Sequence, residues 1–230
     1  KNILNIPMLA RCYERALLSG VCDNLVIATP DQEIIDWATQ FEIPSVLTSH
    51  SHKRATERAK ETLDILTNDG LHYDLVLLLQ GDEPQIFPED IGNLKQAFSN
   101  NELEVVNLVF PLSDDGLEDP NVVKVALDKN LTIHFFSRSH IPHDCISGYR
   151  QLGMIGLTKK ALNNYVSLPP TSLEEVESID MMRLIENDFS IQGVLSTSPI
   201  LGVDTQQDLK KVEKIMTNDK FVNLYKEKYI

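Results

Sequence analysis

The sequence has few cysteines and few basic residues, and it has no long apolar run. Its three cysteines are odd in number and lack the spacing of metal ligands, which argues against a disulfide framework or a zinc site and favours a reducing compartment. Only 21 lysines and arginines stand against 34 aspartates and glutamates, and no basic run is long enough for a nucleic-acid backbone. No apolar stretch could span a bilayer. We therefore expect a cytoplasmic protein without nucleic-acid or membrane partners.

Apolar periodicity predicts alternating strands and helices along the first half of the chain. The length of 230 residues suits one large domain, or one domain with a small appendage. The expected strands are residues 24–29, 45–48, 75–80 and 105–110, and the expected helices are residues 7–19, 31–41, 56–68 and 88–100. Such alternation indicates an α/β fold with a mostly parallel sheet.

The second half has a different rhythm. Residues 122–127 and 132–137 are strand-like and are joined by a turn at residues 128–130, which predicts a hairpin. A strand at 151–157, helices at 159–166 and 172–186, a strand at 191–195 and a helix at 205–216 follow.

The most informative segment is the apolar run at residues 75–79 with the Gln-Gly-Asp-Glu-Pro sequence that follows it. Unbroken Leu and Val predict a strand buried on both faces. Ligands of open α/β sheets bind beyond the carboxyl ends of the strands, which is where Asp82 should lie. A carboxylate there is a natural ligand for Mg²⁺. The alternative is an ordinary polar turn after a strand.

A second carboxylate, Asp204, lies at a predicted strand-to-helix junction. By itself it is more typical of a helix cap, a role open to Asp204 or Thr205. Together with Asp82 it suggests another role, because two aspartates at the ends of different strands could share one Mg²⁺ that handles a nucleoside triphosphate.

Several short motifs occur in an order that resembles one enzyme family. They are Ala-Thr-Glu-Arg at 55–58, Gln-Gly-Asp-Glu-Pro at 80–84, Asp-Pro-Asn-Val-Val-Lys-Val at 119–125, Phe-Ser-Arg at 136–138 with Ile-Pro at 141–142, and Gly-Val-Asp-Thr at 202–205. The family is 3-deoxy-manno-octulosonate cytidylyltransferase, or CMP-Kdo synthetase, where Kdo is the eight-carbon acid sugar. The resemblance runs along essentially the whole chain.

The resemblance implies a reaction, a fold and an assembly. The family couples CTP to Kdo and releases pyrophosphate, in lipopolysaccharide or capsule synthesis. The implied fold is a three-layer Rossmann-like nucleotide-diphospho-sugar transferase domain over residues 1–230, with a small hairpin subdomain at residues 119–150 for dimerisation. A homodimer and a Mg²⁺ cofactor are therefore expected, with CTP and an acid sugar as partners.

The resemblance also implies roles for individual residues. Asp82 and Asp204 match the family's Mg²⁺ ligands, and Lys1 is expected to be the lysine that ends its phosphate loop, with a catalytic role. The remaining matches are Gln80, Arg58 and Ala55 for the nucleotide, and Arg138, Gln151 and Asp180 for the acid sugar.

The chain departs from the family pattern in three places. The family's first strand and phosphate loop would lie before Lys1. Gln151 and Ile155 stand where the family has histidine and tyrosine, and Asp180 and Met181 stand where it has glutamate and glutamine. These changes predict a less polar sugar pocket, and sites built for hydroxyls discriminate strongly by such contacts. The acceptor could therefore be Kdo, a modified Kdo or another acid sugar such as a nonulosonic acid. A non-catalytic CTP-binding homologue is a further alternative.

Overall fold

The computed structural model describes residues 1–99, 102–196 and 198–230. The chain forms two units. Unit 1 consists of Lys1–His50, Leu79–Gly92 and Ser198–Ile230, and unit 2 consists of Ser51–Leu78 and Asn93–Thr197. The chain passes between the units within strand β5 (Leu75–Leu79) and within helix α4 (Pro88–Ala97). None of the helices in these described ranges is long and apolar enough to cross a membrane.

Unit 1 begins with a tight hairpin and a helix. Strands β1 (Asn2–Ile3) and β2 (Ile6–Pro7) pair antiparallel around two residues of positive φ, as a two-residue hairpin turn requires. Helix α1 (Met8–Leu18) follows directly, because Pro7 fixes a φ suited to the residue before a helix. The helix confirms the prediction for residues 7–19.

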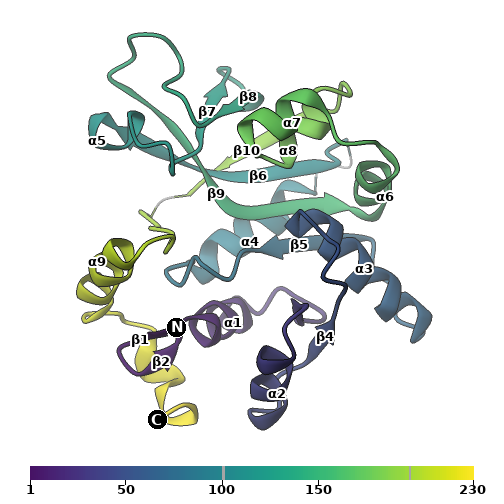
Figure 1. Ribbon diagram of the computed structural model, residues 1–230, viewed down its shortest axis with the longest axis vertical. Helices are drawn as coiled ribbons and strands as arrows, with labels where there is room; N and C mark the ends of the chain where they lie inside the picture. Colours follow the sequence, from purple (N-terminus) through teal and green to yellow (C-terminus); the bar gives the residue numbers. More distant parts are fainter. Residues whose placement is uncertain (100–101, 197) are drawn as a thin grey trace. The chain divides into compact units, whose positions relative to one another are not determined.

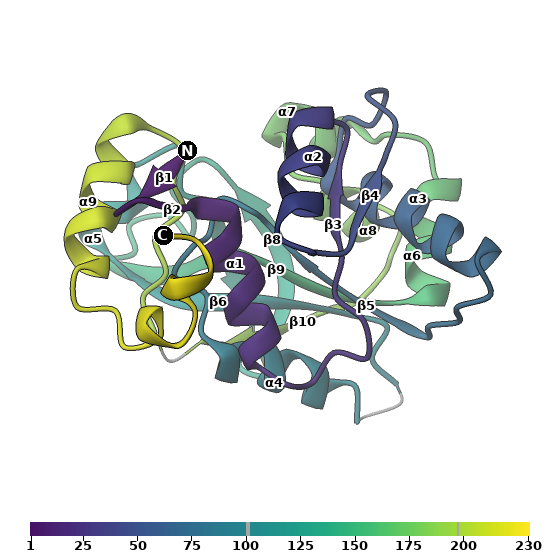
Figure 2. The same ribbon diagram turned by 90° about the horizontal axis from the view of Figure 1, so that it is seen from below.

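A small parallel pair and the carboxyl-terminal segment complete unit 1. Strands β3 (Ile27–Thr29) and β4 (Ser45–Leu47) pair in parallel across helix α2 (Gln32–Gln40). Helix α9 (Gln206–Met216) and two short 3₁₀ turns, Val222–Leu224 and Lys226–Lys228, end the chain. The last turns lie along α1 (Figure 2), where Tyr229 Oη donates a 2.6 Å hydrogen bond to Glu14.

Unit 2 contains most of a six-stranded sheet, in the order β5-β9-β6-β10-β8-β7. The strands not yet given are β6 (Val105–Ser113), β7 (Lys124–Leu127), β8 (Thr132–Ser137), β9 (Ser147–Thr158) and β10 (Ile191–Leu195). Strand β9 also pairs with β7, so the pairings β6–β10–β8–β7–β9–β6 close a ring of five strands (Figure 1).

The sheet is mixed, so the expectation of a mostly parallel sheet is wrong for these pairings. Strands β6 and β10 pair in parallel, whereas β6–β9, β7–β8, β7–β9 and β8–β10 are antiparallel. The reason is the long strand β9, which returns from the hairpin region and runs back along the whole of β6. The hairpin itself is confirmed, and its strands belong to this sheet.

The helices of unit 2 pack around an apolar core. They are α3 (Ala55–Asn68), α5 (Asp114–Leu117), α6 (Lys159–Ser167), α7 (Ser172–Glu177) and α8 (Met181–Ile185). Helix α3 packs against α6, and α8 packs against β8 (Figure 1). The single helix predicted for residues 172–186 is wrong, because Ser178 adopts a left-handed conformation with φ 57° and separates α7 from α8.

Candidate active site

The turn at residues 81–86 follows strand β5 and packs on helix α1. A Cβ atom at Gly81 would lie 3.1 Å from Leu9 Cδ1, so a side chain there would have to displace the end of Leu9 slightly, which shows how closely α1 approaches the turn. The buried thiol of Cys12 donates to the Gly81 carbonyl at 3.4 Å. Burial raises the pKa of Cys12, and the charges of the acidic turn raise it further, which keeps the thiol protonated as a donor.

Asp82 and Asp204 are brought together in unit 1. The Val203 N–H donates to the Asp82 carbonyl at 2.9 Å, which places the residue before Asp204 against the turn. Burial raises the pKa of the Asp82 carboxyl; its own backbone N–H lowers it and the charge of Asp204 raises it. The convergence that the sequence could only suggest is therefore present in the structure.

The two carboxylates have the chemistry of a Mg²⁺ site. Asp82 Oδ1 is buried and has no hydrogen-bond partner among the described residues, whereas Asp204 is exposed. No group of three or more His, Cys, Asp or Glu side chains in the described ranges is arranged to hold a metal. Mg²⁺ commonly uses one or two carboxylates with waters and substrate phosphates, so this donor set fits it. The capping role falls to Thr205, whose hydroxyl accepts from the Asp208 N–H.

Three residues are expected to bind the nucleotide, and Lys1 is expected to act in catalysis. In unit 1, Gln80 is half-buried just before the turn, and Lys1 is exposed with its carbonyl accepting from the Met8 N–H at 2.9 Å. In unit 2, Ala55 is exposed at the first position of α3 and Arg58 is half-buried one turn later. The roles of these four residues stay predictions.

Arg138 is held by the motif at residues 119–125. Its Nη1 donates to the Pro120 carbonyl at 3.1 Å, and its Nε donates to the Glu177 carbonyl at 2.9 Å. The Lys124 side chain is fully buried, and its three N–H donors reach the carbonyls of Asp119, Val122 and Arg138 at 2.6–2.9 Å. Burial lowers the pKa of Lys124, and nearby carboxylates counter this. Nη2 of Arg138 has no bonded partner in the described ranges and remains available to an anion.

Gln151 is fixed by a buried asparagine at a β-bulge. The register of β6 and β9 shifts between Asn107 and Val109. The Asn107 amide group donates to the carbonyls of Leu108, Leu152 and Met154, and its oxygen accepts from Gln151 Nε2 at 2.6 Å. The Gln151 side chain is therefore oriented by the fold, with its amide N–H engaged.

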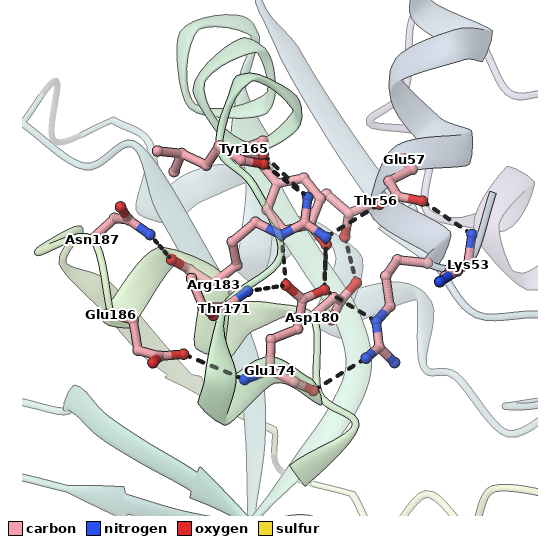
Figure 3. A network of polar contacts seen from close by, with 12 residues as sticks. Lys53, Thr56, Glu57, Tyr165, Thr171, Glu174, Asp180, Arg183, Glu186 and Asn187 are labelled. Atoms are coloured by element: carbon pink, nitrogen blue, oxygen red, sulfur yellow. Dashed lines mark hydrogen bonds and ion pairs between the residues drawn. The ribbon is translucent and has the colours of Figure 1, made fainter. Parts of the chain in front are cut away.

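Asp180 contacts the start of helix α3 (Figure 3). Its Oδ2 accepts a 2.5 Å hydrogen bond from Thr56 Oγ1, within the Ala-Thr-Glu-Arg segment. Burial raises the pKa of Asp180; the Thr56 hydroxyl and the charge of Arg54 lower it. Asp180 is expected to contact the acid sugar, and in the structure it also contacts the segment at residues 55–58 that is expected to bind the nucleotide.

A buried network of charges lies beside Asp180 (Figure 3). Arg183 Nε and Nη2 form a fork on the Glu174 carboxylate at 2.6 and 2.7 Å, and Nη2 also reaches Glu57 on α3. The Arg183 guanidinium lies 4.2 Å over the centroid of the Tyr165 ring. Arg54, which precedes α3, donates to the side chain and to the carbonyl of Glu174. The network ties the start of α3 to α7 and α8.

Ile155 and Met181 do not line a pocket in this structure. Both side chains are completely buried in the apolar core of unit 2. The expectation that they make a sugar pocket less polar is therefore wrong for the described residues, and their substitutions are changes of core packing.

Sequence reasoning missed several residues that support these sites: Lys124, Asn107, Glu174 and Arg183. Lys124 belongs to the motif at residues 119–125, although no role was assigned to it, and Glu174 had a signal in the Thr171-x-x-Glu pattern of a capping box, in which Glu174 Oε2 accepts from the Thr171 N–H. Asn107 and Arg183 are single polar residues in apolar segments, and most of their partners are distant in sequence.

The family model and the similar sequences all point to cytidylyltransferases. The cytidylyltransferase family model matches residues 1–194. A 3-deoxy-manno-octulosonate cytidylyltransferase of Acidobacterium capsulatum is 32% identical over 225 residues, covering 96% of this chain and 90% of that protein. One from Thermodesulfovibrio yellowstonii is 34% identical, covering 92% and 89%.

Solved structures agree with the sequence relatives. A CMP:2-keto-3-deoxy-manno-octonic acid synthetase complexed with CTP superposes with a TM-score of 0.83 at 29% identity, over 95% of this chain and 91% of that one. A putative glucose-1-phosphate thymidylyltransferase from Bacillus anthracis, at 16% identity and a TM-score of 0.66 over 94% of this chain and 84% of that one, has the same fold. The chain belongs to the cytidylyltransferase family, and within it to the 3-deoxy-manno-octulosonate cytidylyltransferases.

Proposed function

We propose that the protein transfers the cytidylyl group of CTP to Kdo and releases pyrophosphate. The observation that carries the proposal is the convergence of Asp82 and Asp204 in a chain of this family. A relative that catalyses no transfer has no need for two neighbouring carboxylates, one of them with a buried oxygen that has no hydrogen-bond partner among the residues the structure describes.

Asp82 and Asp204 are the residues that would hold Mg²⁺. When bound, the ion offsets the negative charge that gathers on the phosphates during nucleotidyl transfer. The buried Oδ1 of Asp82 supports this assignment, since a ligand would satisfy an atom that otherwise loses its hydration without compensation. Gln80, just before the turn, is proposed to contact the cytosine.

The reaction is a displacement at phosphorus. The anomeric hydroxyl oxygen of the sugar forms a bond to the α-phosphorus of CTP, the bond from that phosphorus to the β-phosphate oxygen breaks, and the hydroxyl proton leaves to solvent. The protein contributes alignment and charge more than covalent chemistry. Arg138 is proposed to bind the sugar carboxylate through Nη2, because its Nε and Nη1 are already held by backbone carbonyls. Gln151 and Asp180 are proposed to contact the sugar hydroxyls.

The finer assignments are also proposals. A homodimer formed through residues 119–150, a cytoplasmic location, Mg²⁺ dependence and a place in lipopolysaccharide or capsule synthesis follow the family pattern. A nonulosonic acid is the second candidate acceptor, and Gln151 in place of the family's histidine is the residue that favours it.

A panel of acceptors tests the proposal. Pyrophosphate release from CTP is measured with Mg²⁺ and, in separate reactions, Kdo, 8-amino-Kdo and a sialic-type acid. Release with Kdo is expected. Release only with another sugar would transfer the proposal to that acceptor, and CTP binding without any turnover would support a non-catalytic homologue.

A further inference from the structure

The residues after helix α9 return to helix α1 and meet two buried arginines. Asp219 Oδ2 lies 2.6 Å from Arg15 Nη2 and 3.5 Å from Arg11 Nη1. The Arg15 and Asp219 side chains are each only 4% exposed, and the Arg15 guanidinium lies 4.9 Å over the centroid of the Phe221 ring. Two charges so far from water persist only where their geometry is well satisfied, so α1 holds this segment in a defined place.

Arg15 also holds the turn that carries Asp82. Its Nη1 donates a buried 2.9 Å hydrogen bond to the carbonyl of Ile86, at the end of the turn. The beginning of the turn rests on the same helix, through Leu9 and Cys12 against Gly81. Both ends of the turn therefore depend on α1, and one of them depends on the arginine that pairs with Asp219.

The Asp204 side of the site is joined to the same contacts. Residues 201–203 bind the turn through two hydrogen bonds, one from Val203 N–H to the Asp82 carbonyl and one from Leu201 N–H to Gln85 Oε1. Thr205, directly after Asp204, begins α9 with a capping box. Helix α9 packs on β1 and ends shortly before Asp219. Within unit 1, an unbroken series of contacts therefore joins Asp82 to Asp204. It runs from the turn through α1 and Asp219 to α9, which begins directly after Asp204.

We propose that Asp219 is a positioning residue for the metal ion, acting through Arg15 to set the spacing of Asp82 and Asp204. The inference rests on the proposed function, because it takes these two aspartates as the Mg²⁺ ligands. Mg²⁺ requires near-ideal octahedral geometry, so a change in the spacing of its two carboxylates lowers its affinity. Without the Asp219 charge, the Arg15 guanidinium is no longer held in place and can move away from the Ile86 carbonyl. The end of the turn that carries Asp82 then loses its hydrogen bond to α1.

The test measures metal binding directly. Mn²⁺ is titrated into the full-length protein with CTP but no sugar, and free Mn²⁺ is followed by electron paramagnetic resonance against CTP without protein. Asp219→Asn is expected to weaken Mn²⁺ binding about tenfold, the usual effect of losing a residue that supports a metal ligand. Asp219→Glu should recover part of the loss. Asp36→Asn, an exposed aspartate on α2 of the same unit, is the matched control and should bind as the wild type does.

A second, milder variant keeps the test informative if Asp219→Asn does not fold. Phe221→Leu keeps the ion pair and removes the ring that lies beneath Arg15 and packs edge-to-face on Phe87, and it should weaken Mn²⁺ binding in the same direction by a smaller factor. In turnover, the Mg²⁺ requirement should rise while the Michaelis constant for the sugar stays constant.

The outcomes separate the two proposals. Unchanged Mn²⁺ affinity in folded Asp219→Asn and Phe221→Leu would overturn the role of Asp219 while leaving the proposed function intact. A wild-type protein that binds no Mn²⁺ beyond that held by CTP would overturn the metal assignment and this inference together.

Discussion

Replacing Arg183 by methionine should strongly destabilise unit 2. The substitution removes the fork on Glu174 and the contact with Glu57. The Glu174 side chain, which is only 2% exposed, then loses its principal counter-charge. Removing one partner of a buried ion pair costs about 3–5 kcal/mol, because the other charge stays buried without compensation. Arg54 still reaches Glu174, but its side chain is 21% exposed and it cannot replace the fork. We therefore expect a loss of about 3–5 kcal/mol.

Urea denaturation followed by circular dichroism measures this loss. With a slope of about 2 kcal/mol per molar urea, the midpoint should fall by about 2 M. Lys160→Met provides a matched control, since Lys160 forms an ion pair with Glu104 but is 73% exposed, and its loss should cost less than about 1 kcal/mol.

A double variant tests the cause. If the cost comes from an unpaired buried charge, Glu174→Gln combined with Arg183→Met should destabilise less than the sum of the two single changes. A midpoint for Arg183→Met close to that of the wild type would refute the reasoning, and so would strictly additive losses.

Four other results are expected. Asp82→Asn and Asp204→Asn should each reduce turnover about 100-fold or more, because each removes negative charge at the proposed metal site beside the phosphates. Neither removes core volume, so the circular dichroism spectrum should be unchanged. A full rate in both variants would exclude the metal assignment. Arg138→Ala should raise the Michaelis constant of the sugar more than that of CTP in steady-state assays, whereas the opposite pattern would move this arginine to the nucleotide. Burial raises the pKa of Glu174, but the hydrogen bonds and charge of Arg183 and its other donors outweigh burial and leave that pKa below its usual value. The contribution of the Glu174 carboxylate to stability is thus present above the unfolded pKa of about 4.3 and is lost as the pH falls through the lower folded pKa. Between pH 5 and 3, the free energy of unfolding should therefore drop less in Glu174→Gln than in the wild type. Iodoacetamide should label the other two cysteines of the native protein before Cys12, by mass spectrometry of the digest, because Cys12 is buried and its pKa is raised.

Local patterns predicted those parts of the fold that local chemistry determines. The apolar run of β5 with the turn after it, the hairpin of β7 and β8, and the start of α9 just after Asp204 all have signals in adjacent residues. The pairing of Asp82 with Asp204 could be proposed from the rule that ligands gather beyond strand ends, although only the structure shows the Val203 contact.

The missed features depend on contacts between distant residues. The direction of β9 follows from its pairing along β6, which no short window contains. The break at Ser178 separates two helices whose apolar pattern is continuous, and Ile155 and Met181 were misread because a motif position does not reveal burial. The buried Arg15 on α1 appears as one charge on an amphipathic helix, and Asp219, its partner, lies in the last part of the chain.

The most direct test of the central claim is pyrophosphate release by the purified protein supplied with CTP, Kdo and Mg²⁺, with Asp82→Asn as the control. We expect steady release that requires both substrates and falls to near background in the variant. Tight CTP binding with no release from Kdo or any other acid sugar would contradict the account.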